Sequence, residues 1–123
     1  SRWQYAPFFE LGALSVIQPD LGNCGGLTEG KKICDMAYTY DVSVQAHVCA
    51  SPLSTAAALH LECVIPNFCI HEHHMHNLKE YNKRLCTVDW QPVNGKFKVP
   101  EGPGFGCEPS DYAFAHADKA VVE

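Results

Sequence analysis

The chain has 123 residues, of which 46% are apolar, and it carries a formal net charge of −5. This length and apolar content can build the core of one domain, and they exclude a disordered chain. The scattered Lys and Arg residues form no basic patch for nucleic acid, and no apolar run reaches the roughly 18 residues of a membrane span. We therefore expect a globular protein with neither a nucleic-acid nor a membrane partner.

Seven cysteines are present, an odd number without a CxxC pair, and several fall within apolar stretches. Such thiols pack as small hydrophobic groups, which favours a reducing compartment, and we expect a cytoplasmic protein. The chain begins on Ser1-Arg2-Trp3, already inside a predicted helix that continues through Leu11. We therefore expect a piece of a longer protein.

Short apolar runs and longer amphipathic segments then alternate along the chain. Three runs predict strands, the first buried on both faces: 14–18 (LSVIQ), 42–46 (VSVQA) and 68–70 (FCI). Between the first two, apolar residues at helical spacing predict a helix that Thr28 caps. Between the last two, Ser51-Pro52 begins a helix that ends before Pro66. This order predicts an α/β fold with parallel strands.

The segment 21–26 is rich in glycine and follows the first predicted strand. It lacks the Lys and Ser/Thr of a P-loop and the GxGxxG of a dinucleotide site. We interpret it as a tight turn and expect no nucleotide cofactor.

The last third of the chain has a different character. Residues 78–85 predict a short helix, and Asn94-Gly95 predicts a hairpin turn between 88–93 and 96–99. Ser110 is the predicted cap of a last short helix. The change of character near residue 75 divides the chain into residues 1–75, the strand-helix units, and residues 76–123. The second part is expected to be an extension whose hairpin packs back on the larger structure of these units or on a capping domain.

Three titratable residues follow the three predicted strands. Asp20 and His47 are 27 residues apart, and His47 and Glu72 are 25 apart. A strand, a return helix and two loops need roughly that many residues, so each interval predicts one βαβ unit. The three side chains should therefore meet at one end of a parallel sheet, the end that carries the chemistry in barrel enzymes.

These features resemble the mandelate racemase and muconate lactonizing branch of the enolase superfamily, most closely the galactonate dehydratases. The matching motifs, besides the three spaced residues, are Gln18-Pro19-Asp20, Gly25-Gly26, Ser51-Pro52 and Pro103-Gly104-Phe105-Gly106. The resemblance covers nearly the whole chain but only the last third of a family member. It implies the C-terminal part of a (β/α)8 barrel, with about three parallel strands, completed by the rest of the barrel or by another copy. It also makes a homo-oligomer plausible.

The resemblance also implies roles for these residues. His47 would be the general base that removes the α-proton of a sugar acid, and Asp20 would orient its ring. Glu72 would donate a hydrogen bond to the developing enediolate, so His47 and Glu72 would both contact substrate. The expected reaction is Mg²⁺-dependent dehydration to a 2-keto-3-deoxy acid. The Mg²⁺ ligands would lie on upstream strands, none in this chain, so we expect the chain alone to be inactive.

Two alternatives stay open. Racemases and epimerases of the superfamily use the same base and partner carboxylate. A non-catalytic sensing relative could also retain these residues for structure. Taken singly, Asp20 could be a helix cap, His47 a structural residue and Glu72 a solvated charge.

The run His71–His76 contains four imidazoles and a carboxylate. Imidazoles cluster at zinc and nickel sites, but the run fails the HExxH pattern, and neighbouring side chains on an extended strand point opposite ways. We interpret it as a loop with local polar contacts. Cys49, two residues after His47, is interpreted as a packing thiol rather than a nucleophile.

Overall fold

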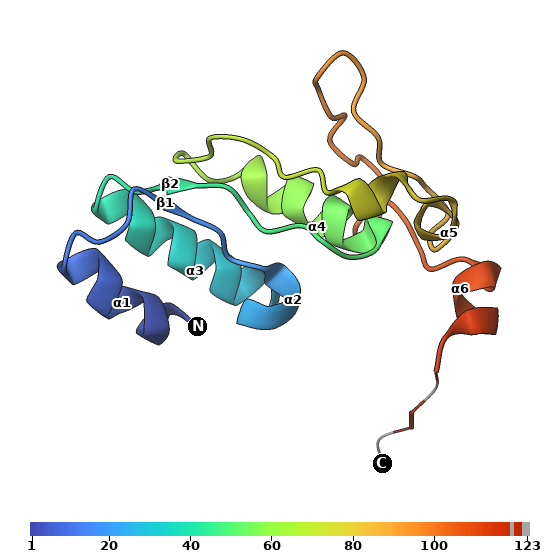
Figure 1. The fold of residues 1–123 in the computed structure, drawn as a ribbon, viewed down its shortest axis with the longest axis horizontal. Helices are drawn as coiled ribbons and strands as arrows, with labels where there is room; N and C mark the ends of the chain where they lie inside the picture. Colours follow the sequence, from blue (N-terminus) through green and yellow to red (C-terminus); the bar gives the residue numbers. More distant parts are fainter. Residues whose placement is uncertain (119, 122–123) are drawn as a thin grey trace.

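The computed structural model describes residues 1–118 and 120–121 (Figure 1). Its first part contains α1 (Arg2–Glu10), β1 (Val16–Ile17), α2 (Leu21–Cys24), α3 (Gly26–Thr39), β2 (Ser43–Val44) and α4 (Pro52–Glu62). Its second part contains the 3₁₀ helix η1 (Met75–Leu78), α5 (Glu80–Lys83) and α6 (Asp111–His116). Among the described residues, no helix has the length and apolar character needed to cross a bilayer.

The sheet is parallel, as the alternation of strands and helices predicts. β1 and β2 pair with Ile17 opposite Val44, and a single parallel bridge joins Val44 to Phe68. The third predicted strand is thus present as one bridge, and the first two are shorter than expected. The prediction of an α/β fragment with a small parallel sheet is confirmed.

Only one face of this sheet is covered. Ile17 and Val44 are 2% and 0% exposed, whereas Val16, which points to the other face, is 45% exposed. Side chains alternate between the faces of a strand, so β1 is buried on its helix side alone. The prediction that this strand is buried on both faces is wrong for the described chain.

The core lies between the sheet and α3. Ile33, Cys34 and Ala37 form the predicted apolar stripe of α3 and pack with Phe9 and Val44. Burial raises the pKa of the Cys34 thiol to about 12, with the Asp35 charge adding to the effect. Cys34 is therefore the inert packing thiol that its apolar surroundings predict.

The segment after β1 differs from the predicted glycine turn. The Asp20 side chain accepts a hydrogen bond from Gly22 N and caps α2, and Gly25 then takes a left-handed conformation with φ of 112°. Because glycine adopts this conformation without a steric penalty, the chain turns there and α3 starts at once. Thr28 therefore lies inside α3 and does not cap it.

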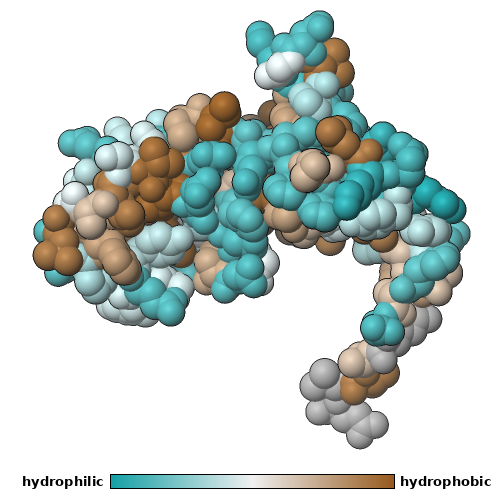
Figure 2. Space-filling view, viewed as in Figure 1, coloured by the Kyte–Doolittle hydropathy of each residue, from teal (hydrophilic) through white to brown (hydrophobic). Residues whose placement is uncertain are grey.

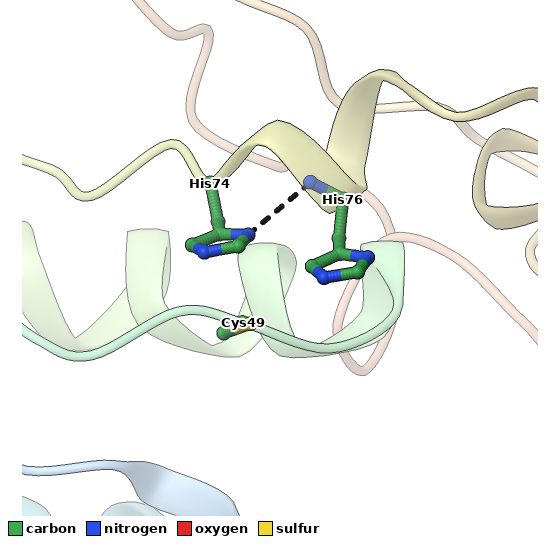
Figure 3. A group of neighbouring side chains, drawn as sticks. All are labelled: Cys49, His74 and His76. Atoms are coloured by element: carbon green, nitrogen blue, oxygen red, sulfur yellow. Dashed lines mark hydrogen bonds between the residues drawn. The ribbon is translucent and has the colours of Figure 1, made fainter.

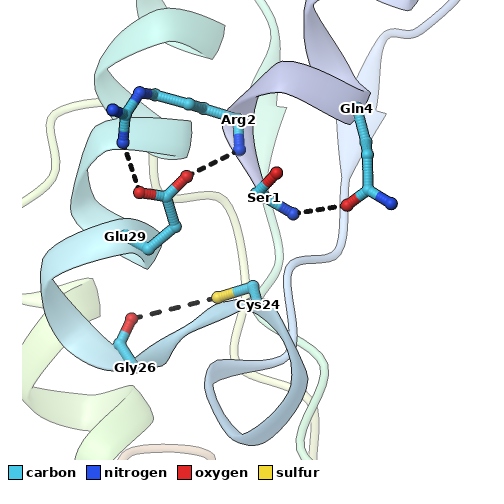
Figure 4. A network of polar contacts seen from close by, with 6 residues as sticks. All are labelled: Ser1, Arg2, Gln4, Cys24, Gly26 and Glu29. Atoms are coloured by element: carbon cyan, nitrogen blue, oxygen red, sulfur yellow. Dashed lines mark hydrogen bonds and ion pairs between the residues drawn. The ribbon is translucent and has the colours of Figure 1, made fainter.

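The N-terminus of α1 is fastened to α3 by polar contacts (Figure 4). Glu29 accepts a hydrogen bond from the backbone N of Arg2 at 2.8 Å and pairs with the Arg2 guanidinium. The backbone hydrogen bond, with the guanidinium charge, holds the pKa of Glu29 below its ordinary value. The carboxylate is thus ionised where it joins the two helices.

The second part keeps the predicted turn at Asn94-Gly95 and the predicted helix cap at Ser110, but the strands expected over 88–93 and 96–99 do not form. Asn94 and Gly95 both have positive φ, 51° and 73°, and form a two-residue turn closed by a single antiparallel bridge. Ser110 caps α6 by accepting a hydrogen bond from Ala113 N. The single helix predicted over 78–85 is wrong, because η1 ends at Leu78 and α5 begins separately at Glu80. The proposed boundary at residue 75 stays a prediction.

Candidate active site

Asp20 and His47 lie opposite each other at the ends of the paired strands. They form an isolated parallel bridge, in which the backbone N of His47 donates to Pro19 O at 3.2 Å. Opposed residues in a ladder point their side chains to the same face. The ring Nδ1 of His47 and Oδ2 of Asp20 are 2.7 Å apart, so the two predicted residues are in direct hydrogen-bond contact.

The Asp20 carboxylate is held in place from two sides. Its Oδ1 accepts from Gly22 N at 2.7 Å, while its Oδ2 faces the His47 ring. Partial burial opposes the charged form, but the hydrogen bonds from His47 and Gly22 outweigh it and hold the pKa of Asp20 below its ordinary value. An ionised Asp20 favours the tautomer of His47 that carries a proton on Nδ1.

This tautomer determines what His47 can do. With the proton on Nδ1, the lone pair lies on Nε2, which has no hydrogen-bond partner among the described residues. The His47 side chain is 43% exposed, against 27% for Asp20. The arrangement therefore presents a proton acceptor to a ligand and a carboxylate that stabilises the resulting imidazolium.

Glu72 reaches the same end of the sheet. Its Oε2 accepts a hydrogen bond from the backbone N of Val48 at 2.7 Å, next to His47 in the chain. This contact leaves Oε1 as the oxygen that can meet a ligand. The three residues that spacing alone predicts to converge are thus linked through neighbouring strand ends.

A buried hydrogen-bonded pair in this segment is absent from the sequence-based predictions. His71 Nδ1 lies 2.7 Å from Glu62 Oε2 of α4, with the two side chains 7% and 4% exposed. The pair fixes the backbone that precedes Glu72 against α4. A Glu on the apolar side of a helix was the available signal, because a buried carboxyl group requires a hydrogen-bond partner.

A groove in the described surface lies away from the dyad formed by Asp20 and His47. It has a volume of about 690 Å³ and is lined by residues of α4, of the segment 68–73 and of the loop that carries Phe97. Asp20, His47 and Glu72 do not line it. The hydrogen-bond geometry of these three residues, rather than cavity size, identifies the candidate active site.

The carboxylates near the dyad do not form a Mg²⁺ site. Asp20, Glu72 and Glu62 already bond to His47, the Val48 backbone and His71 respectively. Mg²⁺ prefers an octahedral set of oxygen ligands, which these engaged groups do not supply. The described residues that could share one ion are instead Cys49, His74 and His76. We therefore assign no step of a reaction to Mg²⁺ bound by this chain.

Comparison with solved structures shows close relatives of two kinds. A protein from Salmonella typhimurium, provisionally named a dehydratase, is 50% identical over 100% of this chain, with a TM-score of 0.95. Another from Zymomonas mobilis ZM4 with the same provisional name is 51% identical over 96%, with a TM-score of 0.93. A protein from Labrenzia alexandrii, provisionally named a mandelate racemase/muconate lactonizing enzyme, is 30% identical over 94%, with a TM-score of 0.83.

The chain matches only part of each relative. It covers 31% of the Salmonella protein and 30% of each of the other two. A family model, described as enolase C-terminal domain-like, matches residues 1–113. That match spans most of the chain and agrees with the parallel sheet and its helices. The chain therefore belongs to the enolase C-terminal domain-like family.

Proposed function

We propose that this chain supplies the proton-abstracting side of the active site in a dehydratase that acts on sugar acids of the galactonate type. The observation that carries the proposal is the 2.7 Å contact between Asp20 and His47 at the ends of parallel strands. Relatives at 50% and 51% identity that bear the provisional name dehydratase support the reaction class.

In the proposed reaction, His47 Nε2 takes the proton from the carbon next to the substrate carboxylate. The electron pair of the broken C–H bond forms an enediolate, and Asp20 stabilises the imidazolium that results. Glu72, through its second oxygen, hydrogen-bonds the developing enediolate when that oxygen carries a proton. A general acid from the rest of the barrel would protonate the β-hydroxyl, which leaves as water, and the resulting enol tautomerises to a 2-keto-3-deoxy acid.

Racemization or epimerization is the second candidate. The Labrenzia relative and a Sinorhizobium meliloti protein provisionally named an isomerase, 31% identical, favour it. Both reactions begin with the same proton transfer to His47. They differ in the fate of the enediolate, because dehydration expels a hydroxyl group and racemization returns a proton to the opposite face.

The test uses a complete barrel, since the chain covers less than a third of its relatives. Residues 1–123 replace the matching segment of the Salmonella protein, and the chimera is assayed on a panel of sugar acids in D₂O. Loss of water with release of a 2-keto acid supports dehydration, and α-deuterium exchange without water loss supports racemization. A chimera that does neither on any sugar acid, while the Salmonella parent is active, contradicts both.

Substitution of Asp20 and His47 tests whether His47 is the residue that takes the proton. We expect His47→Asn and Asp20→Asn to lower the rate of α-proton exchange by about 10²- to 10⁴-fold, the usual contribution of a positioned acid-base group. His116→Asn, at an exposed histidine of α6, is the matched control and should leave the rate unchanged. Full exchange in the His47→Asn chimera contradicts the assignment of His47 as the base.

A further inference from the structure

Three side chains with metal-binding atoms converge beside the dyad (Figure 3). Cys49 comes from the loop between β2 and α4, while His74 and His76 come from the start of η1. One ligand atom from each lies within 4.8 Å of the other two. The imidazole rings stack with centroids 4.9 Å apart, and Figure 3 shows the Cys49 side chain beneath them.

The spacing of these residues explains why they meet. Cys49 lies two residues beyond His47, and His74 lies two residues beyond Glu72, on the neighbouring segment. Val48 N donates to Glu72 Oε2 and holds the two segments side by side, so the residues that follow on each segment come close together. Cys49 belongs to another loop, so the pattern of residues within 71–76 does not reveal it as a partner.

Hydrogen bonds hold the two backbone segments that carry these side chains. Asn82 Nδ2 of α5 donates to Ala50 O at 2.8 Å and fixes the loop that carries Cys49. The Tyr81 hydroxyl lies 3.5 Å from His76 Nδ1, and His74 Nδ1 accepts from His76 N at 3.2 Å. Both Nδ1 atoms are thus engaged, which leaves the two Nε2 atoms for an ion. A metal-bound histidine usually donates its other ring N–H to an outer partner. The Tyr81 hydroxyl can accept such a bond from His76, whereas His74 must first give up its contact with His76 N.

The ligand set decides the class of ion. A thiolate with two imidazoles suits Zn²⁺, Co²⁺ and similar ions, whereas Mg²⁺ takes oxygen ligands. Around a tetrahedral Zn²⁺, with bonds of about 2.0–2.3 Å, ligand atoms stand roughly 3.3–3.7 Å apart. The ligand atoms therefore need to approach by at most about 1.1–1.5 Å, a movement that rotation of the exposed Cys49 side chain and the imidazole rings can supply.

We propose that Cys49, His74 and His76 bind one transition-metal ion of the zinc class, with its remaining position open to solvent. On binding, the thiol proton of Cys49 passes to the buffer. The His74 proton moves from Nε2 to Nδ1, which gives up the hydrogen bond from His76 N. The site uses none of the residues of the dyad and does not depend on the proposed dehydratase activity.

The test is a titration of the purified, reduced chain with Co²⁺, followed by the absorption of the thiolate-to-cobalt charge transfer. We expect saturation at one ion per chain. Cys49→Ser should abolish the charge-transfer band, and His74→Asn and His76→Asn should each weaken binding by at least 10- to 100-fold, since loss of an outer partner alone costs that much. Mg²⁺ at the same concentration should not compete.

Two controls separate this site from other thiols and imidazoles. Cys63→Ser removes another exposed thiol and His116→Asn another exposed imidazole, and both variants should bind Co²⁺ as the unmodified chain does. Imidazole NMR signals of the unmodified chain give a second measurement that needs no variant. Addition of Zn²⁺ should shift His74 and His76 and leave His116 in place. An unchanged charge-transfer band in Cys49→Ser, or unmoved His74 and His76 signals, overturns the proposal.

Discussion

At the scale of single residues, the carboxylate of Asp20 connects the active site to the acid stability of the fold. The hydrogen bonds from His47 and Gly22 hold its pKa below the ordinary value of 3.8, against the opposing effect of burial. A carboxyl group with a lowered pKa stabilises the folded state at pH above its ordinary value. This stabilisation is lost as pH falls through the lower pKa of the folded state.

Removal of the His47 ring tests this connection. We expect His47→Leu to raise the pKa of Asp20, because the ring contributes both a hydrogen bond and a favourable charge. The acid unfolding midpoint should rise with it, so that the variant unfolds at higher pH. Carbon-13 NMR titration of the Asp20 carboxyl group measures the first effect, and circular dichroism against pH the second. His116→Leu is the control, and an unchanged Asp20 pKa in His47→Leu contradicts the prediction.

The sequence predicts the convergence of Asp20, His47 and Glu72 because their spacing is a property of the βαβ unit itself. It does not predict the partners that arise from side-chain packing between loops. The pairing of His71 with Glu62 depends on how α4 lies against the third strand segment. Spacing along the chain carries no information on such a contact.

At the scale of secondary-structure elements, one glycine lets a side chain of α2 pack closely against α3. Gly30 is buried in α3, and a Cβ at this position would stand 2.4 Å from Leu21 Cδ2. Leu21 is the first residue of α2 and follows Asp20 directly, so the crossing of the two helices positions the cap of α2. The same crossing therefore helps to place the dyad.

Substitution of this glycine measures the close approach. Overpacking costs about 1–3 kcal/mol, while alanine regains up to about 1 kcal/mol of helix propensity. We therefore expect Gly30→Ala to lower the free energy of unfolding by about 1 kcal/mol, measured by urea unfolding. Thr28→Ala, at an exposed position of the same helix, should raise it slightly. Adding Leu21→Ala to the Gly30→Ala variant should lower the free energy of unfolding less than Leu21→Ala does in the unmodified chain. Strictly additive losses contradict the close contact.

The order and type of the main elements follow from hydrophobic periodicity, but their ends do not. β1 and β2 span two residues each, since parallel pairing depends on neighbours along the whole ladder. α3 starts at Gly26 rather than after Thr28, because the left-handed conformation of Gly25 permits an immediate turn. Local propensity therefore indicates which elements form, and long-range pairing decides where they end.

At the scale of the whole molecule, the described surface retains apolar side chains around its first helix and its sheet (Figure 2). Large exposed residues here are Trp3 (72%), Leu11 (80%), Val16 (45%), Phe68 (41%) and Ile70 (59%). Exposed apolar surface next to a strand edge is a template for association with another chain. We propose that this surface is covered by further barrel structure or by another copy, as the expected homo-oligomer requires.

Association of the purified chain tests this expectation. We expect its apparent mass, measured by size-exclusion chromatography with light scattering, to rise over about a hundredfold increase in concentration. Ile70→Lys, at the sheet edge, should shift the chain toward the monomer, because a charge at an edge opposes pairing. Met75→Lys places the same charge at another exposed apolar position and should change the mass less. A monomer at every concentration contradicts the prediction.

The bridge between Asp20 and His47 makes one backbone amide a reporter of the active site. The amide of His47 donates to Pro19 O in the last rung of the ladder, beside the side-chain contact of the same residues. Opening of that rung separates the base from its carboxylate. The deuterium uptake of this single amide therefore gives a lower limit on how often the site is misaligned, without substrate or turnover.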